Sequence, residues 1–313
     1  MKHRTKLLAL ACSIFSVGIF LCVSQNTRSY VSKRHHVAIC ITGQVGRLEL
    51  ESKVKNLFVM NDNAGIIMSA FLVLDPQKVQ YSKAPPTLTW SSSSTPTDTI
   101  LHEASHNLRK WLRSVSLLND TTDFSYIADN SWRKHYLSRL EDPRERQSML
   151  SKHLKQFWGN AVCANLISYD EVERNVKYDV ILRIRDNSVV VQPFQLPIRM
   201  LLETPGAYVK NCAGWGGVND KVMLTTRKYM NVVLRGWIDS FMFTSSGNSS
   251  TISNPERFLQ HVLVSANVPI VRLEADIFPI VDGRIHYGQG LCIVEETKDC
   301  HPSHLSDYQT CLY

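Results

Sequence analysis

Residues 37–47 read VAICITGQVGR, and this stretch does most to decide the fold. Its first six residues form a nearly continuous apolar run, which is typical of a strand buried on both faces, as in a parallel sheet. Gly43 and Gly46 then mark a turn, and residues 48–58 carry apolar side chains at roughly helical spacing. A strand, a glycine turn and a helix in that order predict the opening unit of an α/β fold.

The rest of the chain continues this alternation. Further apolar runs predict strands at 64–74, 178–186, 207–210, 220–225 and 268–273. Helices are predicted for 102–118, 144–173 and 254–266, the last with Asn254 as its N-cap and Pro255 as its first residue. Strands that alternate with helices predict a three-layer α/β sandwich with a mostly parallel sheet.

The N-terminus resembles a membrane anchor. Residues 7–23 are uncharged and apolar, and the basic segment 1–6 before them favours a cytoplasmic N-terminus. A cleaved signal peptide is the alternative. Both interpretations place a short stem, 24–36, and a single domain, 37–313, in the lumen or outside the cell. We therefore expect a type II membrane protein of the Golgi or endoplasmic reticulum, a location with which glycosylation sequons at Asn119 and Asn248 agree.

Charge and cysteine content narrow the choice of partners. The net charge of +7 includes the basic N-terminal tail, and no run of five Lys or Arg occurs, so nucleic acid is not an expected partner. Six of the eight cysteines follow the anchor and could form up to three disulfides: Cys40, Cys163, Cys212, Cys292, Cys300 and Cys311. We predict Cys292–Cys300 first, because a mobile terminus gains most from a cross-link. Cys40 could equally be a buried free thiol.

Charged residues gather at the end of the predicted strand 178–186. Arg183 and Arg185 share one face of this strand, and open α/β sheets bind ligands at the carboxyl ends of their strands. Two guanidinium groups there predict a site for an anion such as a diphosphate, with Asp186 and Asn187 binding a ribose, a metal or a sugar hydroxyl. An ion pair that closes the sheet edge without any ligand is the alternative.

A second segment with chemical potential is GWGGVND, residues 214–220. Its glycines allow close approach of a ligand, and Trp215 offers a flat face to a sugar ring or a base. Asn219 and Asp220 could bind hydroxyls, and Asp220 could act as a general base. A turn that caps the next element explains the segment equally well.

Three further features have both a functional and an ordinary interpretation. Gly43 and Arg47 could hold phosphate at a helix N-terminus, or belong to an ordinary turn. Glu256 could be catalytic, or simply a carboxylate favoured at a helix start. The stretch 102–106, HEASH, matches a zinc-protease motif but lacks the extension that supplies a third histidine, so a chance match is expected.

Together these segments resemble poorly characterised glycosyltransferase-like proteins of the secretory pathway. In those proteins a Tyr-Asp-x-x-x-Arg-x-Arg-Asp segment precedes a Gly-Gly-x-Asn-Asp segment and a Pro-Glu helix, as residues 178–186, 216–220 and 255–256 do here. The resemblance spans roughly residues 37–275 and implies a GT-A-type nucleotide-diphospho-sugar fold. It implies donor-side residues Gly43, Arg47, Arg183, Arg185 and Asp186, and acceptor-side residues Asn219, Asp220 and Glu256.

The expected function is therefore sugar transfer from a nucleotide sugar to a glycan or protein acceptor. The chain has no Asp-x-Asp motif; Asp186 is nearest to the position of that metal ligand, and Arg183 and Arg185 could supply positive charge instead. Mn²⁺ or Mg²⁺ remains open as a cofactor. A non-catalytic, lectin-like lumenal protein is the main alternative. Sulfotransfer would need a lysine in the phosphate-binding turn at 43–47, which contains none.

Overall fold

The structure is a computed structural model that describes residues 34–76, 97–118, 143–243, 254–286, 290–293, 299–303 and 305. A compact unit runs from His35 to Tyr313. Among the described residues, no helix has both the length and the apolar character needed to cross a membrane. The predicted anchor, 7–23, and the two sequons lie outside the described residues.

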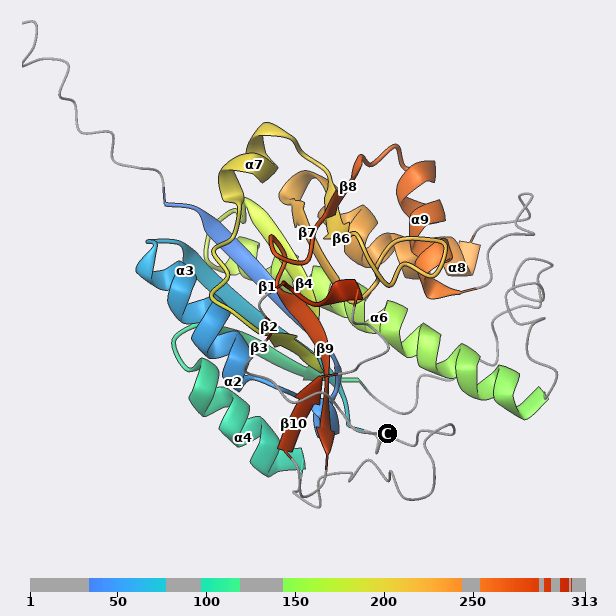
Figure 1. The fold of residues 1–313 in the computed structure, drawn as a ribbon, viewed down its shortest axis with the longest axis horizontal. Coiled ribbons are helices and arrows are strands. Elements are labelled where there is room, and N and C mark those ends of the chain that lie inside the picture. Colours follow the sequence, from blue (N-terminus) through green and yellow to red (C-terminus); the bar gives the residue numbers. More distant parts are fainter. Residues whose placement is uncertain are drawn as a thin grey trace, which may run out of the picture. The chain divides into compact units, whose positions relative to one another are not determined.

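A seven-stranded sheet forms the centre of this unit (Figure 1). Its strands are β1 (His36–Gln44), β2 (Ile67–Asp75), β3 (Leu112–Leu117), β4 (Val180–Arg185), β6 (Ala207–Lys210), β7 (Val222–Thr226) and β8 (Ile270–Leu273). Their order is β3-β2-β1-β4-β7-β6-β8. All neighbours pair in parallel except β7, which is antiparallel to both β4 and β6. The mostly parallel sheet predicted from the sequence is confirmed.

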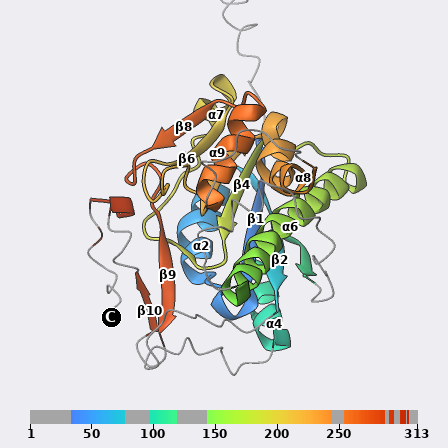
Figure 2. The same cartoon turned by 90° about the vertical axis from the view of Figure 1, so that its right-hand side faces the viewer.

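Helices cover both faces of the sheet, which confirms the three layers (Figure 2). On one face lie α2 (Glu51–Lys53), the π-helical turn η2 (Val54–Phe58), α3 (Val59–Asn63), α4 (Thr97–Leu108) and α7 (Ile198–Glu203). On the other lie α6 (Pro143–Glu173), α8 (Gly236–Phe243) and α9 (Pro255–Ser265). Side chains of β1 alternate between the two cores, so the continuous apolar run is explained by burial on both faces.

A disulfide joins the central strand to the longest helix. Cys40 of β1 is bonded to Cys163 of α6, and neither residue is exposed to solvent. Cys40 is therefore not the free thiol that the sequence left open. Because α6 packs against β1 and β2, this cross-link fixes the helix over the strand whose carboxyl end enters the site.

One predicted helix is wrong in its second half. The sequence favoured a helix over 102–118, but α4 ends at Leu108 and residues 112–117 form the edge strand β3. Burial alternates along β3 between half-buried and exposed side chains, and the exposed ones include Val115 and Leu117, as expected of a half-covered edge strand. A short stretch of mixed polar and apolar residues fits both the helical and the strand periodicity, and here the pairing with β2 selects the strand.

A second sheet, not predicted from the sequence, contains β5 (Ser188–Val190), β9 (Ile280–His286) and β10 (Gly290–Ile293) in the order β10-β9-β5. All of its pairings are antiparallel. β5 begins soon after β4 ends, and Asn187 between them donates from Nδ2 to the carbonyl of Gly283 at 3.2 Å. The small sheet thus brings the C-terminal part of the chain beside the end of β4.

Candidate functional site

The carboxyl ends of β1 and β4 meet at a buried ion pair. Arg47 donates from Nε to Asp186 Oδ2 at 2.8 Å and from Nη2 to Oδ1 at 3.0 Å, and the backbone N–H of Gln44 donates to Oδ2 at 2.9 Å. Asp186 is completely buried. Gly43 has φ 150°, and a Cβ at this position would overlap the Asp186 carboxylate. The structure therefore brings these predicted donor residues together, but as an ion pair that fixes the turn.

This ion pair decides whether Asp186 fits a divalent cation. Both of its carboxylate oxygens accept charge-assisted hydrogen bonds from one guanidinium, an arrangement that already neutralises and satisfies the group. Within the described ranges, no three His, Cys, Asp or Glu residues are grouped so that they could hold a metal. Asp186 thus does not fit the role of a ligand for Mn²⁺ or Mg²⁺. His102 and His106 of the HEASH stretch lie exposed along α4.

Arg183 also turns inward. It is buried, donates from Nε to Asn160 Oδ1 at 3.2 Å and from Nη1 to the backbone carbonyl of Asp220, and lies over the ring of Trp237 at 6.0 Å. Burial lowers the pKa of Arg183 to about 10, which leaves it cationic at neutral pH. Of the charged residues predicted on the donor side, Arg185 is the one that is partly exposed.

Asp220 is a buried carboxylate close to three positively charged side chains. Burial opposes ionisation, but the charges of Arg185, Arg183 and Lys221 lower the pKa of Asp220 below its ordinary value. Gln156 donates from Nε2 to its Oδ2 at 2.6 Å. The other oxygen, Oδ1, is buried and has no hydrogen-bond partner among the described residues. Such an unsatisfied oxygen on a buried carboxylate is unusual and marks a place where a proton or a donor could bind.

Glu256 lies beside Asp220, and its pKa is shifted in the opposite direction. Burial, and then the negative charge of Asp220, raise the pKa of Glu256 to about 7. The N–H of Val218 donates to the Glu256 carbonyl at 3.2 Å, and a Cβ at Gly217 would overlap the backbone of Glu256, so the glycine-rich segment packs directly on the start of α9. Two neighbouring carboxyl groups with pKa values pushed apart are typical of acid–base sites.

Three residues of α6 complete this cluster and were not predicted. His153, Gln156 and Asn160 follow each other at spacings of three and four, which places them on one face of the helix. Asn160 Oδ1 accepts from Thr42 Oγ1 at 3.2 Å as well as from Arg183. Burial lowers the pKa of His153 to about 4, so its imidazole is neutral at physiological pH. Polar residues on the otherwise apolar inner face of an amphipathic helix were the signal available in the sequence.

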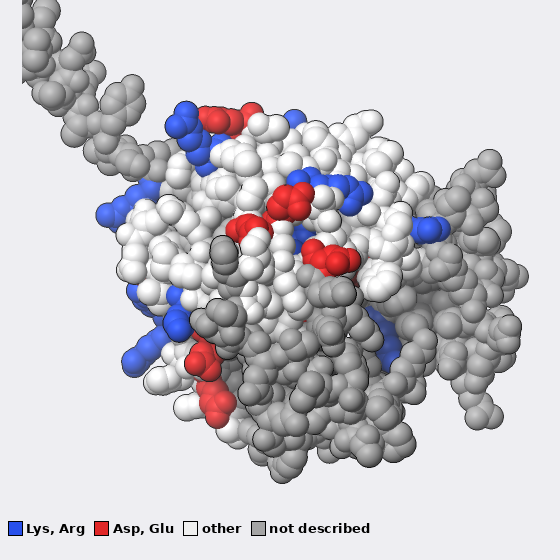
Figure 3. Space-filling view, in the orientation of Figure 1, with Lys and Arg blue, Asp and Glu red and all other residues white. Residues whose placement is uncertain are grey.

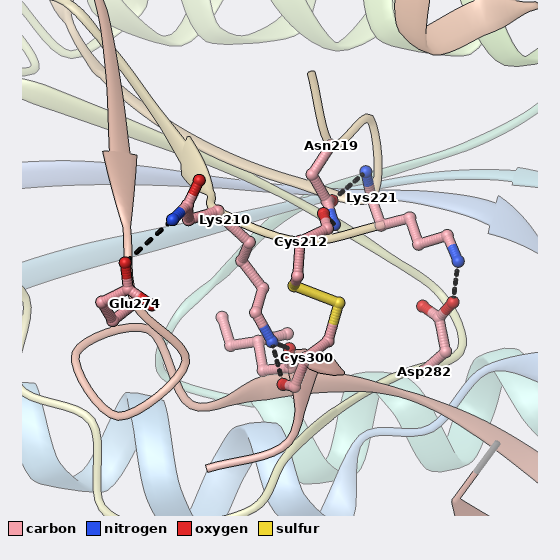
Figure 4. The surroundings of a disulfide bond; sticks show 9 residues. Lys210, Cys212, Asn219, Lys221, Glu274, Asp282 and Cys300 are labelled. Atoms are coloured by element: carbon pink, nitrogen blue, oxygen red, sulfur yellow. Dashed lines mark hydrogen bonds and ion pairs between the residues drawn. A yellow bond between two sulfur atoms is a disulfide. The ribbon is translucent and has the colours of Figure 1, made fainter. Parts of the chain in front are cut away.

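Residues 211–220, here called the glycine loop, connect β6 to β7 and are closed at their base. Asn219 donates from Nδ2 to the carbonyl of Cys212 at 3.0 Å and accepts at Oδ1 from the N–H of Lys221 at 2.9 Å. Figure 4 shows Asn219 beside the disulfide of Cys212 at the base of the loop. Both polar atoms of this buried side chain therefore bond to the backbone at the two ends of the loop, so Asn219 closes the loop.

The disulfide at the base of the glycine loop corrects a prediction. Cys300 is bonded to Cys212, so the predicted Cys292–Cys300 pair is wrong. Buried Lys210 helps to bring the distant tail here, since its Nζ donates to the carbonyls of Ile280 and Cys300 (Figure 4). The two cysteines are 88 residues apart, and their approach depends on the small sheet, which local sequence patterns did not reveal.

We expect mild reduction to open Cys212–Cys300 before Cys40–Cys163. Cys212 is half-buried, whereas both cysteines of the second bond are fully buried, and thiol exchange requires access to a sulfur.

Loss of the cross-link by Cys212→Ser with Cys300→Ser should lower the free energy of unfolding by about 2–5 kcal/mol. Thiol labelling with mass spectrometry, followed by denaturant titration, measures both effects. Equal labelling of all four cysteines would contradict the expected order.

Charged side chains of both signs lie on the described surface of the domain. On the part of the face in Figure 3 that the structure describes, Lys and Arg side chains lie among Asp and Glu. The positive charges that matter for the site, those of Arg183, Arg185 and Lys221, are instead gathered around Asp220.

No protein-family model matches the chain, and no curated protein matches it. Solved structures that are similar to it include a nucleoside-diphosphate-sugar pyrophosphorylase from Vibrio cholerae RC9, with 10% identity over 79% of this chain and 94% of that chain and a TM-score of 0.41. The PaToxG glycosyltransferase matches with 11% identity over 74% of this chain and 68% of that chain and a TM-score of 0.29. Mouse xyloside xylosyltransferase 1 in its apo form matches with 10% identity over 78% of this chain and 85% of that chain and a TM-score of 0.31. With TM-scores below 0.5, these likenesses assign neither a family nor the role of any residue.

Proposed function

We propose that this protein is a glycosyltransferase that moves a sugar from a nucleotide-sugar donor to an acceptor hydroxyl. The observation that carries the proposal is the pair formed by Asp220 and Glu256, one ionised and one with a pKa of about 7, beside Arg185 at the carboxyl edge of the sheet. The resemblance of the segments around these residues to secretory-pathway glycosyltransferase-like proteins supports sugar as the transferred group.

Glu256 is the general base in this proposal. Its carboxylate takes the proton of the acceptor hydroxyl while that oxygen bonds to the anomeric carbon of the donor. The bond from the anomeric carbon to the phosphate oxygen breaks, and its electron pair leaves with the nucleoside diphosphate. A carboxyl group with a pKa near 7 is a stronger base than an ordinary glutamate and is still half ionised at neutral pH. Asp220 contributes the negative charge that raises this pKa.

Arg185 is proposed to neutralise the leaving diphosphate. It is the partly exposed cation at the end of β4, and Arg183 and Lys221 add positive charge in the same neighbourhood. Fixed positive charges at the place where negative charge develops stabilise the transition state without reorganisation. Because Arg47 already occupies both oxygens of Asp186, these side chains are proposed to act in place of a divalent cation at that position.

Binding of nucleotides by the purified full-length protein tests the proposal. Calorimetric titration with UDP, GDP and CMP, each in EDTA and in Mn²⁺, should show one nucleotide class bound in both conditions. Arg185→Ala should weaken that binding about tenfold or more, since hydrogen bonds to charged groups are strong. Arg199→Ala, which removes a highly exposed arginine of α7, is the matched control and should change nothing.

Two outcomes would contradict the proposal in different ways. If a folded protein bound no nucleotide, the transferase would be excluded. If binding required Mn²⁺, the sugar-transfer proposal would stand, but neutralisation by arginine alone would be wrong.

A lectin-like protein without turnover is the second candidate. It is favoured by one observation: Arg47, Arg183 and Asp186, which the resemblance implies on the donor side, are buried and bonded within the protein. This alternative needs the sugar-binding surface at Trp215 but no nucleotide, so the titration above separates the two.

We also propose a type II orientation in the Golgi or endoplasmic reticulum membrane, with the domain in the lumen. The basic, then apolar, pattern of residues 1–23 supports it, and so do two disulfides, which form in oxidising compartments. Glycosidase treatment of protein made in cells checks this: an unchanged gel mobility, with Asn119 and Asn248 unmodified, would argue against a lumenal domain.

A further inference from the structure

The tip of the glycine loop has an unusual backbone conformation. Ala213 and Trp215 have φ values of 45° and 44°, and Gly216 has a φ of 83°. Residues other than glycine rarely adopt positive φ, and a side chain as large as that of tryptophan does so only when its surroundings determine it. Two questions follow from this conformation: which contacts hold the glycine loop, and which side chain the loop exposes.

Contacts from three directions hold the glycine loop. The disulfide to Cys300 fixes its base. Asn254, the N-cap of α9, donates from Nδ2 to the Trp215 carbonyl at 2.9 Å, and Arg272 of β8 donates from Nη2 to the Gly217 carbonyl at 3.1 Å. Hydrogen bonds to both flanks of the tip, together with the cross-link, leave it little freedom to rearrange, so the loop is a rigid mount for Trp215.

What the loop presents is an exposed indole. Trp215 is 59% exposed, whereas Trp111 and Trp237 lie in the core. An aromatic ring that remains largely in water contributes little to the stability of the folded state by burial. Such rings supply a large flat contact area with little loss of conformational freedom when a ligand covers them.

The position of the loop indicates which substrate meets this ring. Gly217 and Val218 contact the backbone of Glu256, so the glycine loop that carries Trp215 packs beside the start of α9, which also carries the proposed base. The substrate that must reach Glu256 is the acceptor, because its hydroxyl loses the proton. The diphosphate, in contrast, is drawn to Arg185 at the end of β4.

We propose that Trp215 is the stacking platform for a sugar ring of the acceptor, and hence that the acceptor is a glycan. A pyranose has an apolar C–H face that covers an indole and a rim of hydroxyls, one of which can then point toward Glu256. This inference rests on the proposed function for the direction of transfer. The hydroxyl of an unglycosylated serine or threonine offers no such face.

The test uses the full-length protein and two probes: a glycan array followed by calorimetric titration of the best-bound oligosaccharide, and titration of the nucleotide in parallel. We expect Trp215→Ala to weaken glycan binding about tenfold or more, and Trp215→Phe to weaken it less, because a ring remains. Nucleotide affinity should stay within about twofold. Trp158→Ala is the matched control, since Trp158 is a second exposed tryptophan, on the outer face of α6.

Several outcomes would overturn the inference. Wild-type protein that bound no glycan, with or without nucleotide, would do so, and so would unchanged glycan affinity in Trp215→Ala. Loss of nucleotide affinity in that variant would show that the indole stacks on the base of the donor instead. Saturation-transfer NMR on the wild-type protein provides a reading that needs no folded variant: magnetisation must reach the C–H protons of one ring face. Glycan binding through Trp215 without any nucleotide binding would confirm the stacking surface, but it would exclude the transferase and with it the assignment of the glycan as an acceptor.

Discussion

Replacing Glu256 with Gln is expected to reduce the turnover number of sugar transfer by about 10²–10⁴-fold, the usual contribution of a general base. Glutamine keeps the size of the side chain and can still form hydrogen bonds, but its amide does not accept the proton of the acceptor hydroxyl. Nucleotide affinity should remain within about twofold, because Arg185 and not Glu256 is proposed to contact the diphosphate. The measurement is steady-state kinetics with the donor identified by titration.

The role of Glu256 as a general base also predicts how the rate of sugar transfer depends on pH. Glu256 acts as a base only when ionised, and its pKa is raised to about 7, so kcat/KM should rise tenfold per pH unit below about pH 7 and level off above it. Asp220→Asn removes the negative charge that helps to raise the pKa of Glu256, and should move this inflection to lower pH. The residual activity of Glu256→Gln should lack the inflection.

Glu203→Gln is the matched control for this series. Glu203 is an exposed carboxylate of α7 that pairs with Arg199, and α7 packs on the face of the sheet opposite to α9. Its replacement should leave both the rate and the pH profile unchanged. Full activity in Glu256→Gln, or an inflection that persists there, would remove Glu256 from the mechanism.

The second large effect concerns stability. Asp186→Asn should lower the free energy of unfolding by about 3–5 kcal/mol, because it removes the carboxylate that pairs with the buried guanidinium of Arg47. Removing both charges with Arg47→Met and Asp186→Asn should restore a large part of the loss, since the buried guanidinium is then removed together with its partner. Urea denaturation of the two single variants and the double variant measures this coupling.

An exposed pair serves as the control for the buried one. Arg199 and Glu203 are 91% and 61% exposed in their side chains, and removing both should change stability by no more than about 0.5 kcal/mol. If Asp186→Asn were instead stable and lost a nucleotide affinity that depended on Mn²⁺, Asp186 would be a metal ligand and the structural role of the pair would be wrong.

Local patterns in the sequence were enough for much of the fold. The apolar run of β1 and the Asn254-Pro255 start of α9 are each specified by neighbouring residues, and the structure confirms them, with Asn254 accepting from the N–H of Arg257 at 2.8 Å. The glycine turn is confirmed in part, since Gly46 lies in the turn Val45–Arg47 whereas Gly43 still belongs to β1. Features that depend on distant partners were missed. The small sheet and the Cys212–Cys300 bond join segments far apart in the chain, and no local signal encodes their pairing.

In the candidate site, too, the sequence predicted features that depend on neighbouring residues and missed those that depend on distant partners. The resemblance to glycosyltransferase-like proteins implied that Arg47 and Asp186 both lie on the donor side. It could not show that they would bond to each other, which depends on the register that sets Thr42 opposite Arg185 and so Gly43 beside Asp186. Likewise, Asp220 and Glu256 could be named as acidic candidates, but their opposite pKa shifts arise only from burial and from the charges that the fold gathers around them.

The bond between Cys212 and Cys300 also ties the assembly of the site to the order of biosynthesis. The partner of Cys163 has already been made when that residue leaves the ribosome, so the cross-link between β1 and α6 can close on a growing chain. The glycine loop must wait for a residue 88 positions later before its base is fixed. The proposed platform is therefore fixed later than the sheet, and a chain that had not yet reached Cys300 would carry the sheet with the base of the glycine loop still open.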